Sequence, residues 1–226
     1  MKKIGLVGGT SWISTLDYYK LINEGVNSKL GGLNFAECMI YSLNFGEIQE
    51  VGWSNSFPIL INACESLKRG GVKGIALCAN TPHLFADKLQ NALQIPFIHI
   101  VVETAKAINM QGLKKVALLG TKFTMEMNFY RDKLRECGLE VIIPEKDETR
   151  DYIQYTIKEE LGIGLINLET KKNYVAIANE LIERGAEGII LGCTEIPMLL
   201  SQDDFEIRVF DTTKIHSKAI VEFIVS

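Results

Sequence analysis

The sequence predicts an α/β protein built from two similar halves, each a mostly parallel sheet flanked by helices. Two observations lead to this fold class. Short, continuously apolar runs alternate along the chain with longer amphipathic segments, which is typical of βαβ units whose strands are buried on both faces. In addition, segments of the first half reappear in the second half at nearly the same spacing, as expected after an internal duplication.

The elements follow from the apolar patterns. Seven apolar runs are expected to be strands: Ile4–Val7, Met39–Leu43, Gly74–Leu77, Val116–Leu119, Val141–Ile143, Gly188–Leu191 and Val209–Phe210. Six segments with apolar residues at three-to-four spacing are expected to be helices: Tyr18–Leu30, Ile59–Arg69, Phe85–Ala92, Glu103–Met110, Met125–Cys137 and Lys171–Arg184. Several of them end on glycine shortly before a strand, which suits the left-handed turn that closes a helix.

The repeat is visible in two pairs of segments. Lys2–Thr10 is similar to Lys114–Thr121, and Gly74–Leu77 is similar to Gly188–Leu191. The two matches are offset by 112 and 114 residues. A plainer explanation stays open, because any turn from strand to helix tends to be rich in glycine and apolar residues.

The repeat divides the chain, which we take as a single unit over 1–226, into two lobes. Lobe 1 is expected at about 1–100 with 211–226, and lobe 2 at about 101–210. Ligands of parallel sheets bind beyond the carboxyl ends of the strands. We therefore expect a pseudo-twofold arrangement with the site between the lobes, formed by the loops Gly8–Ser14, Cys78–His83, Gly120–Thr124 and Gly192–Pro197.

Composition narrows the class of protein. Apolar residues make up 47% and charged residues 23%, with a net charge of −4, so a basic surface for nucleic acid is not expected. No apolar run reaches the roughly 18 residues that span a membrane. The five cysteines are odd in number and scattered, which favours free thiols in the cytoplasm. No cysteines or histidines have the spacing of metal ligands, so no metal site is expected.

Two strand-end loops carry the strongest chemical signals. Cys78 begins the loop Cys-Ala-Asn-Thr-Pro-His, and Cys193 lies in Gly-Cys-Thr-Glu. A thiol at the start of a helix is expected to have a lowered pKa, and the backbone N–H groups of such a turn can hold a carboxylate. The alternative is that these cysteines are small buried apolar residues, which is the preferred interpretation for Cys38, Cys64 and Cys137.

At these loops the chain resembles a known family. Gly-Cys-Thr-Glu at 192–195, Ala-Asn-Thr-Pro-His at 79–83 and Ile-Gly-Leu-Val-Gly-Gly-Thr-Ser-Trp at 4–12 are similar to motifs of the cofactor-independent aspartate/glutamate racemases. The similarity runs nearly end to end and is strongest to the amino-acid and aspartate racemase branch. It implies a small amino-acid substrate, no cofactor and, since members are often dimers, a homodimer as an option.

The resemblance also implies a mechanism. Two residues on opposite faces of Cα exchange the weakly acidic α-proton, and hydrogen-bond donors stabilise the charge that spreads into the carboxylate. Cys193 is the expected acid/base on one face. Glu195 has three open roles: orienting substrate, polarising Cys193 or favouring a helix start. The candidate substrate-binding residues are Thr10, Ser11, Asn80, Thr81, Thr121, Thr194 and Glu195.

The first departure from the family concerns the second acid/base. Both the Asn-Thr-x-His motif and the internal repeat place Ala79, which cannot carry a proton, where that residue belongs. Cys78 precedes it, and consecutive strand residues point to opposite faces, so Cys78 is expected to face away. Either Cys78 acts as the second acid/base, or another group or a water molecule does, or the second acid/base is missing.

The second departure concerns the substrate. Aspartate needs a cation for its side-chain carboxylate, but neither Ser42–Ile48 nor Leu161–Gly164 contains Lys or Arg. A broad or uncharged specificity is therefore open. Two other functions stay open as well: a lyase or decarboxylase of the same superfamily that uses one cysteine, and a binding protein that lost catalysis. We interpret His83 as a hydrogen-bonding residue and Glu145–Arg150 as solvated charges.

Overall fold

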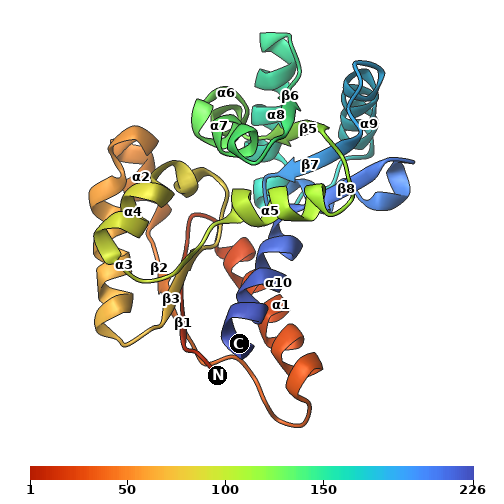
Figure 1. Ribbon diagram of the computed structural model, residues 1–226. Coiled ribbons are helices and arrows are strands. Elements are labelled where there is room, and N and C mark those ends of the chain that lie inside the picture. Colours follow the sequence, from red (N-terminus) through yellow and green to blue (C-terminus); the bar gives the residue numbers. More distant parts are fainter. The chain divides into compact units, whose positions relative to one another are not determined.

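The computed structural model describes residues 1–226, and its contacts divide the chain into two compact units (Figure 1). Unit 1 comprises Met1–Glu103 together with Thr213–Ser226, and unit 2 comprises Thr104–Thr212. None of the helices combines the length and the apolar composition that a membrane span requires.

Unit 1 is built on a four-stranded parallel sheet with the order β2-β1-β3-β4. Its strands are β1 (Ile4–Gly8), β2 (Cys38–Ser42), β3 (Gly74–Leu77) and β4 (Phe97–Ile98). Its helices are α1 (Trp12–Leu30), α2 (Phe45–Val51), α3 (Phe57–Arg69), α4 (Ala86–Leu93) and α10 (Thr212–Val225), with short 3₁₀ turns η1 (Trp53–Asn55) and η2 (Thr81–Phe85). Helix α5 (Ile100–Asn109) begins in unit 1 and continues into unit 2 from Thr104.

The two faces of this sheet are covered by different helices (Figure 1). Val7, Ile75 and Leu77 pack with residues of α3 and α4 on one face. Leu6 and Ala76, which alternate with them along the strands, pack with α1 and α10 on the other face. Because successive strand residues point to opposite faces, continuous apolar runs fill both layers.

Unit 2 repeats this topology with the strand order β6-β5-β7-β8, again all parallel. Its strands are β5 (Lys115–Gly120), β6 (Glu140–Ile142), β7 (Gly188–Gly192) and β8 (Arg208–Asp211). Its helices are α6 (Lys122–Glu126), α7 (Asn128–Glu136), α8 (Asp147–Glu159) and α9 (Leu168–Glu183), with 3₁₀ turns η3 (Leu161–Ile163), η4 (Ile196–Met198) and η5 (Gln202–Asp204). The predicted α/β class with two similar parallel sheets is confirmed.

Two expected segments differ from the structure. The helix predicted over Met125–Cys137 is interrupted at Met127, whose extended backbone (φ −71°, ψ 141°) separates α6 from α7. Of the charges interpreted as solvated at Glu145–Arg150, those of residues 145–148 are exposed as expected, whereas Arg150, in the first turn of α8, is largely buried. The helices α2, α8 and α10 and the two-residue strand β4 were not predicted.

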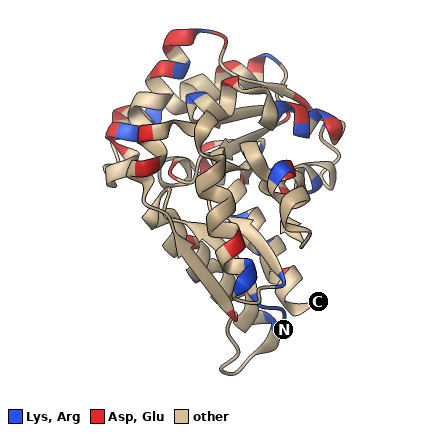
Figure 2. Cartoon of the chain, turned by 90° about the vertical axis from the view of Figure 1, so that its left-hand side faces the viewer, with Lys and Arg blue, Asp and Glu red and all other residues tan.

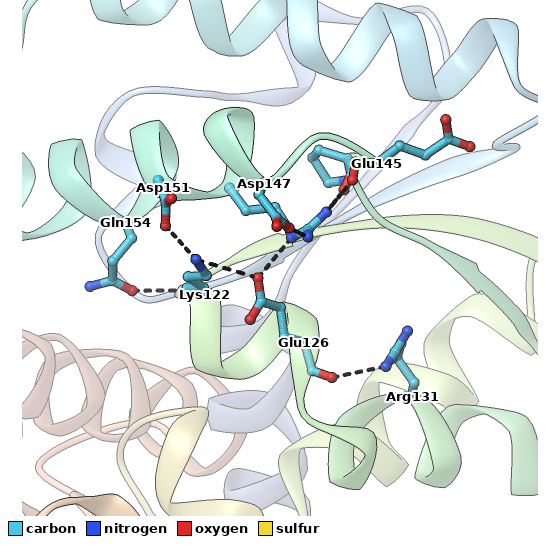
Figure 3. A network of polar contacts seen from close by, with 9 residues as sticks. Lys122, Glu126, Arg131, Glu145, Asp147, Asp151 and Gln154 are labelled. Atoms are coloured by element: carbon cyan, nitrogen blue, oxygen red, sulfur yellow. Dashed lines mark hydrogen bonds and ion pairs between the residues drawn. The ribbon is translucent and has the colours of Figure 1, made fainter.

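A polar network explains the burial of Arg150 (Figure 3). Its Nε donates to Glu126 Oε1 at 2.8 Å, its Nη1 donates to the carbonyls of Pro144 and Glu145 at 2.6 Å each, and its Nη2 pairs with Asp147. These bonds join the end of α6 to the start of α8. Elsewhere, acidic and basic residues are interspersed along the helices (Figure 2).

Candidate active site

In unit 1, the loop that follows β1 lies directly against the loop that follows β2. Gly9 has φ +88°, and a Cβ placed there would lie 2.2 Å from the Leu43 carbonyl oxygen, so only glycine fits. Ser11 is the N-cap of α1 and accepts from the Ser14 N–H at 3.2 Å. The predicted residues Thr10 and Ser11 are therefore held at the carboxyl edge of the sheet, with the Ser11 hydroxyl oxygen already engaged as a cap.

The loop after β3 is joined to this first loop, because the Ser14 hydroxyl donates to the Cys78 carbonyl at 2.9 Å. The Cys78 side chain is 1% exposed and packs in the apolar layer with α1 and α10, while the Ala79 side chain is half-buried. Burial raises the pKa of the Cys78 thiol, and Cys38 raises it further. Cys78 therefore lies in the core as a protonated thiol, on the face expected from strand alternation.

Asn80 and Thr81 are buried in the same loop, and His83 fixes its backbone. His83 Nδ1 lies 2.9 Å from the Ala79 carbonyl, and His83 Nε2 accepts from the Ile100 N–H at 3.2 Å. A carbonyl cannot donate, so Nδ1 carries the proton and the ring is neutral. Burial lowers the pKa of His83 well below its ordinary value, and His99 and His216 lower it further.

His216 packs next to His83 and supports the loop after β3. No role was predicted for this histidine from the sequence. Its ring lies 5.6 Å from that of His83, its Nε2 donates to the Ile98 carbonyl at 2.8 Å, and its Nδ1 accepts from the Tyr18 hydroxyl at 2.9 Å. Burial lowers its pKa to about 3. One histidine amid apolar residues of α10 gives no pattern that reveals such contacts.

In unit 2, the ends of β5 and β7 are adjacent, with Gly120 opposite Gly192 in the sheet. Thr121 follows β5 as the N-cap of α6 and accepts from the Thr124 N–H at 3.1 Å. Cys193 follows β7. The structure therefore brings Thr121 and the Gly-Cys-Thr-Glu segment to one edge of one sheet.

Cys193 forms a hydrogen bond with a carboxylate. Its Sγ donates to Glu195 Oε2 at 2.9 Å, and the Thr194 hydroxyl donates to the same oxygen at 2.9 Å. Cys193 is 7% exposed, whereas Thr194 and Glu195 are half-buried. Of the three roles considered for Glu195, this geometry favours the one in which its carboxylate polarises the Cys193 thiol.

The expectation of a lowered thiol pKa at this position is wrong. Burial raises the pKa of Cys193 well above its ordinary value, and the Glu195 carboxylate raises it further. Backbone hydrogen bonds from Glu195 and Thr194 act in the opposite direction but are outweighed. At neutral pH the resting thiol is therefore protonated, and its proton points at a carboxylate.

A family model described as Asp/Glu/hydantoin racemase matches residues 7–220. The chain belongs to this family. A candidate Asp/Glu racemase from Yersinia pestis has 41% identity and a TM-score of 0.94, covering 100% of both chains. An aspartate racemase homologue from Pyrococcus horikoshii OT3 has 42% identity and a TM-score of 0.88, again over 100% of both chains.

A third relative is named for a broad substrate specificity of its own. The broad specificity amino-acid racemase RacX of Bacillus subtilis (strain 168) is 27% identical over 230 residues, which covers 96% of each chain. Within the family fold, Cys193 supplies a thiol at the end of β7, whereas Ala79, after β3, offers a methyl group.

Proposed function

We propose that the protein is a cofactor-independent amino-acid racemase that removes and returns the proton at Cα, with Cys193 as an acid/base. The observation that carries the proposal is the 2.9 Å hydrogen bond from the Cys193 thiol to Glu195 at a strand end. Family membership supports the reaction class, and the pair supplies one thiol and one proton acceptor for it.

The Cys193–Glu195 pair accounts for the protons in a balanced way. Glu195 accepts the thiol proton, and the resulting thiolate then removes the α-proton, leaving a carbanion and a re-formed thiol. In the reverse direction the thiol returns a proton to Cα and recovers its own from Glu195. Because the pKa of Cys193 is raised, the thiol does not lose its proton to water at neutral pH. Glu195 is therefore needed as the proton acceptor each time the thiolate forms.

The carbanion must spread its charge into the substrate carboxylate, and hydrogen-bond donors lower that barrier. Thr194 and Thr121 are positioned at the same sheet edge as Cys193. The assignment of Thr10, Ser11, Asn80 and Thr81 to carboxylate binding stays a prediction from the sequence, as does a role for Cys78.

Hydrogen exchange tests the proposal. Purified protein is incubated in heavy water with a panel of L- and D-amino acids, and deuterium at Cα is measured by mass spectrometry. We expect exchange by the wild type, none by Cys193→Ser, and an approximately 100-fold reduction by Glu195→Gln. The matched control is Cys137→Ser, which changes a half-buried thiol at the end of α7.

Two results would reject a racemase. Absence of exchange with every amino acid, together with binding by calorimetry, would indicate a binding protein.

The second candidate is a lyase or decarboxylase that protonates a carbanion on one face. The presence of a thiol at Cys193 but only a methyl group at Ala79 favours this candidate. Release of CO₂ from malonate-type acids, lost in Cys193→Ser, would identify that activity.

A further inference from the structure

The edge strand β2 of unit 1 has one free side. It pairs only with β1, and none of its five residues is buried. The N–H of Leu43, directly after β2, donates to the Gly8 carbonyl at 3.0 Å. Since the backbone groups of successive strand residues point to opposite sides, the N–H and C=O groups of Cys38, Ile40 and Ser42 face away from the sheet.

The other three sheet edges are protected in the ways that natural proteins use, namely short strands, charges and proline. Strand β4 has two residues and follows Pro96. Strand β6 has three residues, and its Glu140 pairs with Lys115 at 3.0 Å. Strand β8 begins with Arg208 and ends with Asp211. By contrast β2, which has the position in unit 1 that β6 has in unit 2, consists of five residues, Cys-Met-Ile-Tyr-Ser, without charge or proline.

Exposed apolar side chains lie along this unprotected edge. We call Leu33, Phe35, Met39 and Ile40 the edge patch, and they are 91%, 50%, 36% and 42% exposed. Leu33 and Phe35 belong to the segment that joins α1 to β2 and projects from unit 1 (Figure 1). Together the four side chains expose roughly 400 Å² of apolar surface, which is the size of patches that are often functional on monomers.

The outer side of α1 extends the edge patch. Asn23 Oδ1 accepts from the Ala36 N–H at 3.0 Å, and Asn23 Nδ2 donates to the Tyr19 carbonyl at 2.7 Å. These bonds hold α1 beside the segment that leads into β2. Tyr19 and Leu16, one turn apart, are 47% and 56% exposed. With them, two copies joined at this edge would bury on the order of 1,000 Å² in total, which is about what a biological interface needs.

We propose that β2 binds the β2 strand of a second copy of this chain, so that two unit 1 sheets join edge to edge in a twofold dimer. An antiparallel pair of identical strands satisfies the free backbone groups of both copies and closes the assembly. In the symmetric register Ile40 lies opposite the partner's Ile40, and Cys38 lies opposite the partner's Ser42. The charge nearest to the strand in sequence, Glu37, is already paired with Lys3 at 3.0 Å, so like charges do not oppose the contact.

Sedimentation equilibrium of the full chain tests the interface. We expect the wild type at twice the 25.3 kDa of one chain. Ile40→Lys and Ile40→Pro should each give the mass of one chain, because the first places like charges together and the second removes an N–H that β1 does not use. The matched control is Ile163→Lys, at an isoleucine of unit 2 that is 74% exposed, which should remain a dimer. Far-ultraviolet circular dichroism like that of the wild type shows that each variant is folded.

Disulfide trapping tests the register independently. Opposed residues that exchange hydrogen bonds in an antiparallel pair have Cα atoms about 5.5 Å apart, within the range that a disulfide spans. Diamide, which takes two electrons and two protons from a pair of thiols, should therefore link two copies of Ile40→Cys. Non-reducing electrophoresis should show this covalent dimer, and Ile163→Cys should give no more of it than the wild type.

Three outcomes would overturn the proposal. The first is a wild type with the mass of one chain. The second is a dimer that survives Ile40→Lys and dissociates in Ile163→Lys, which would place the interface in unit 2. The third is a failure to trap Ile40→Cys, which would reject the twofold strand pairing. None of these measurements depends on amino-acid exchange, so the racemase proposal and the dimer proposal are tested separately.

Discussion

At the scale of single residues, the loops after β7 and β3 differ in what each can offer to the proposed proton transfer. Cys193 has a thiol and a carboxylate partner, whereas Ala79 has no proton to give. Cys78 is next to Ala79 in sequence but buried in the apolar layer with α1 and α10. Exchange is therefore expected to be fast for one enantiomer, slow for its mirror image, and slower still for inversion.

Adding a thiol at Ala79 tests whether the missing second acid/base causes the expected difference between the two enantiomers. Ala79→Cys should raise the inversion rate by about 10²–10⁴-fold, the usual contribution of one positioned acid/base, as measured by circular dichroism. Cys78→Ser is the neighbouring control and should change inversion little, although it places a hydroxyl in an apolar layer. If Cys78→Ser stops inversion and Ala79→Cys has no effect, Cys78 is the partner and the alignment is wrong.

At the scale of elements, Arg150 holds the segment that positions Thr121. It joins α6 to α8 and satisfies the carbonyls of Pro144 and Glu145. Lys122, directly after Thr121, adds a bond from its N–H to Gln154 Oε1 at 2.9 Å (Figure 3). The start of α6 is thus fixed by polar contacts with α8.

Replacing this arginine should destabilise unit 2. Arg150→Met leaves the two carbonyls and Glu126 without their donor, which should lower the free energy of unfolding by about 1–3 kcal/mol. The control is Arg135→Met, an exposed arginine paired with Asp132, with an expected change below about 1 kcal/mol. Urea unfolding of both variants gives the comparison, and equal changes would show that the Arg150 network is not stabilising.

Elements whose burial shows as a local apolar pattern could be predicted from the sequence, whereas features set by contacts with other segments could not. Strands such as Gly74–Leu77 were predicted because their apolar runs fill two layers, and the matched segments indicated two similar halves. Helix α8 was not predicted because the charged residues at its start look solvated, whereas in the structure Arg150 binds the carbonyls of Pro144 and Glu145 just before the helix. The Cys193 pKa was predicted in the wrong direction because burial and the rotamer of Glu195 are not visible in a local motif.

At the scale of the whole molecule, the chain returns to unit 1 through α10, and the buried His216 ties α10 to the rest of unit 1 by hydrogen bonds. His216 bonds to Tyr18 and to the carbonyl of Ile98, which are 198 and 118 residues away in sequence. His83 similarly bonds to Ala79 and Ile100. Both rings are neutral and each ring nitrogen has a partner; His83 cannot gain a proton on Nε2 without losing the hydrogen bond from the Ile100 N–H.

This arrangement predicts acid sensitivity. An unfolded histidine has a pKa of about 6.5, whereas the pKa of His216 in the fold is about 3 and that of His83 is also lowered. Below about pH 6.5 the unfolded chain binds more protons, so stability falls with falling pH until the folded pKa is reached. Between pH 7 and pH 5 His216 should remove up to about 2 kcal/mol from the free energy of unfolding, and His83 should act in the same direction.

Urea unfolding at several pH values measures this loss, and NMR titration of the imidazole signals identifies the groups. His216→Gln keeps a donor and an acceptor but cannot titrate, so it should be less stable at pH 7 yet lose less stability between pH 7 and pH 5. Because α10 and the loop that holds Asn80 share these histidines, the same acid step should loosen both. A His216 signal that titrates near pH 6.5 in the folded protein would contradict this explanation.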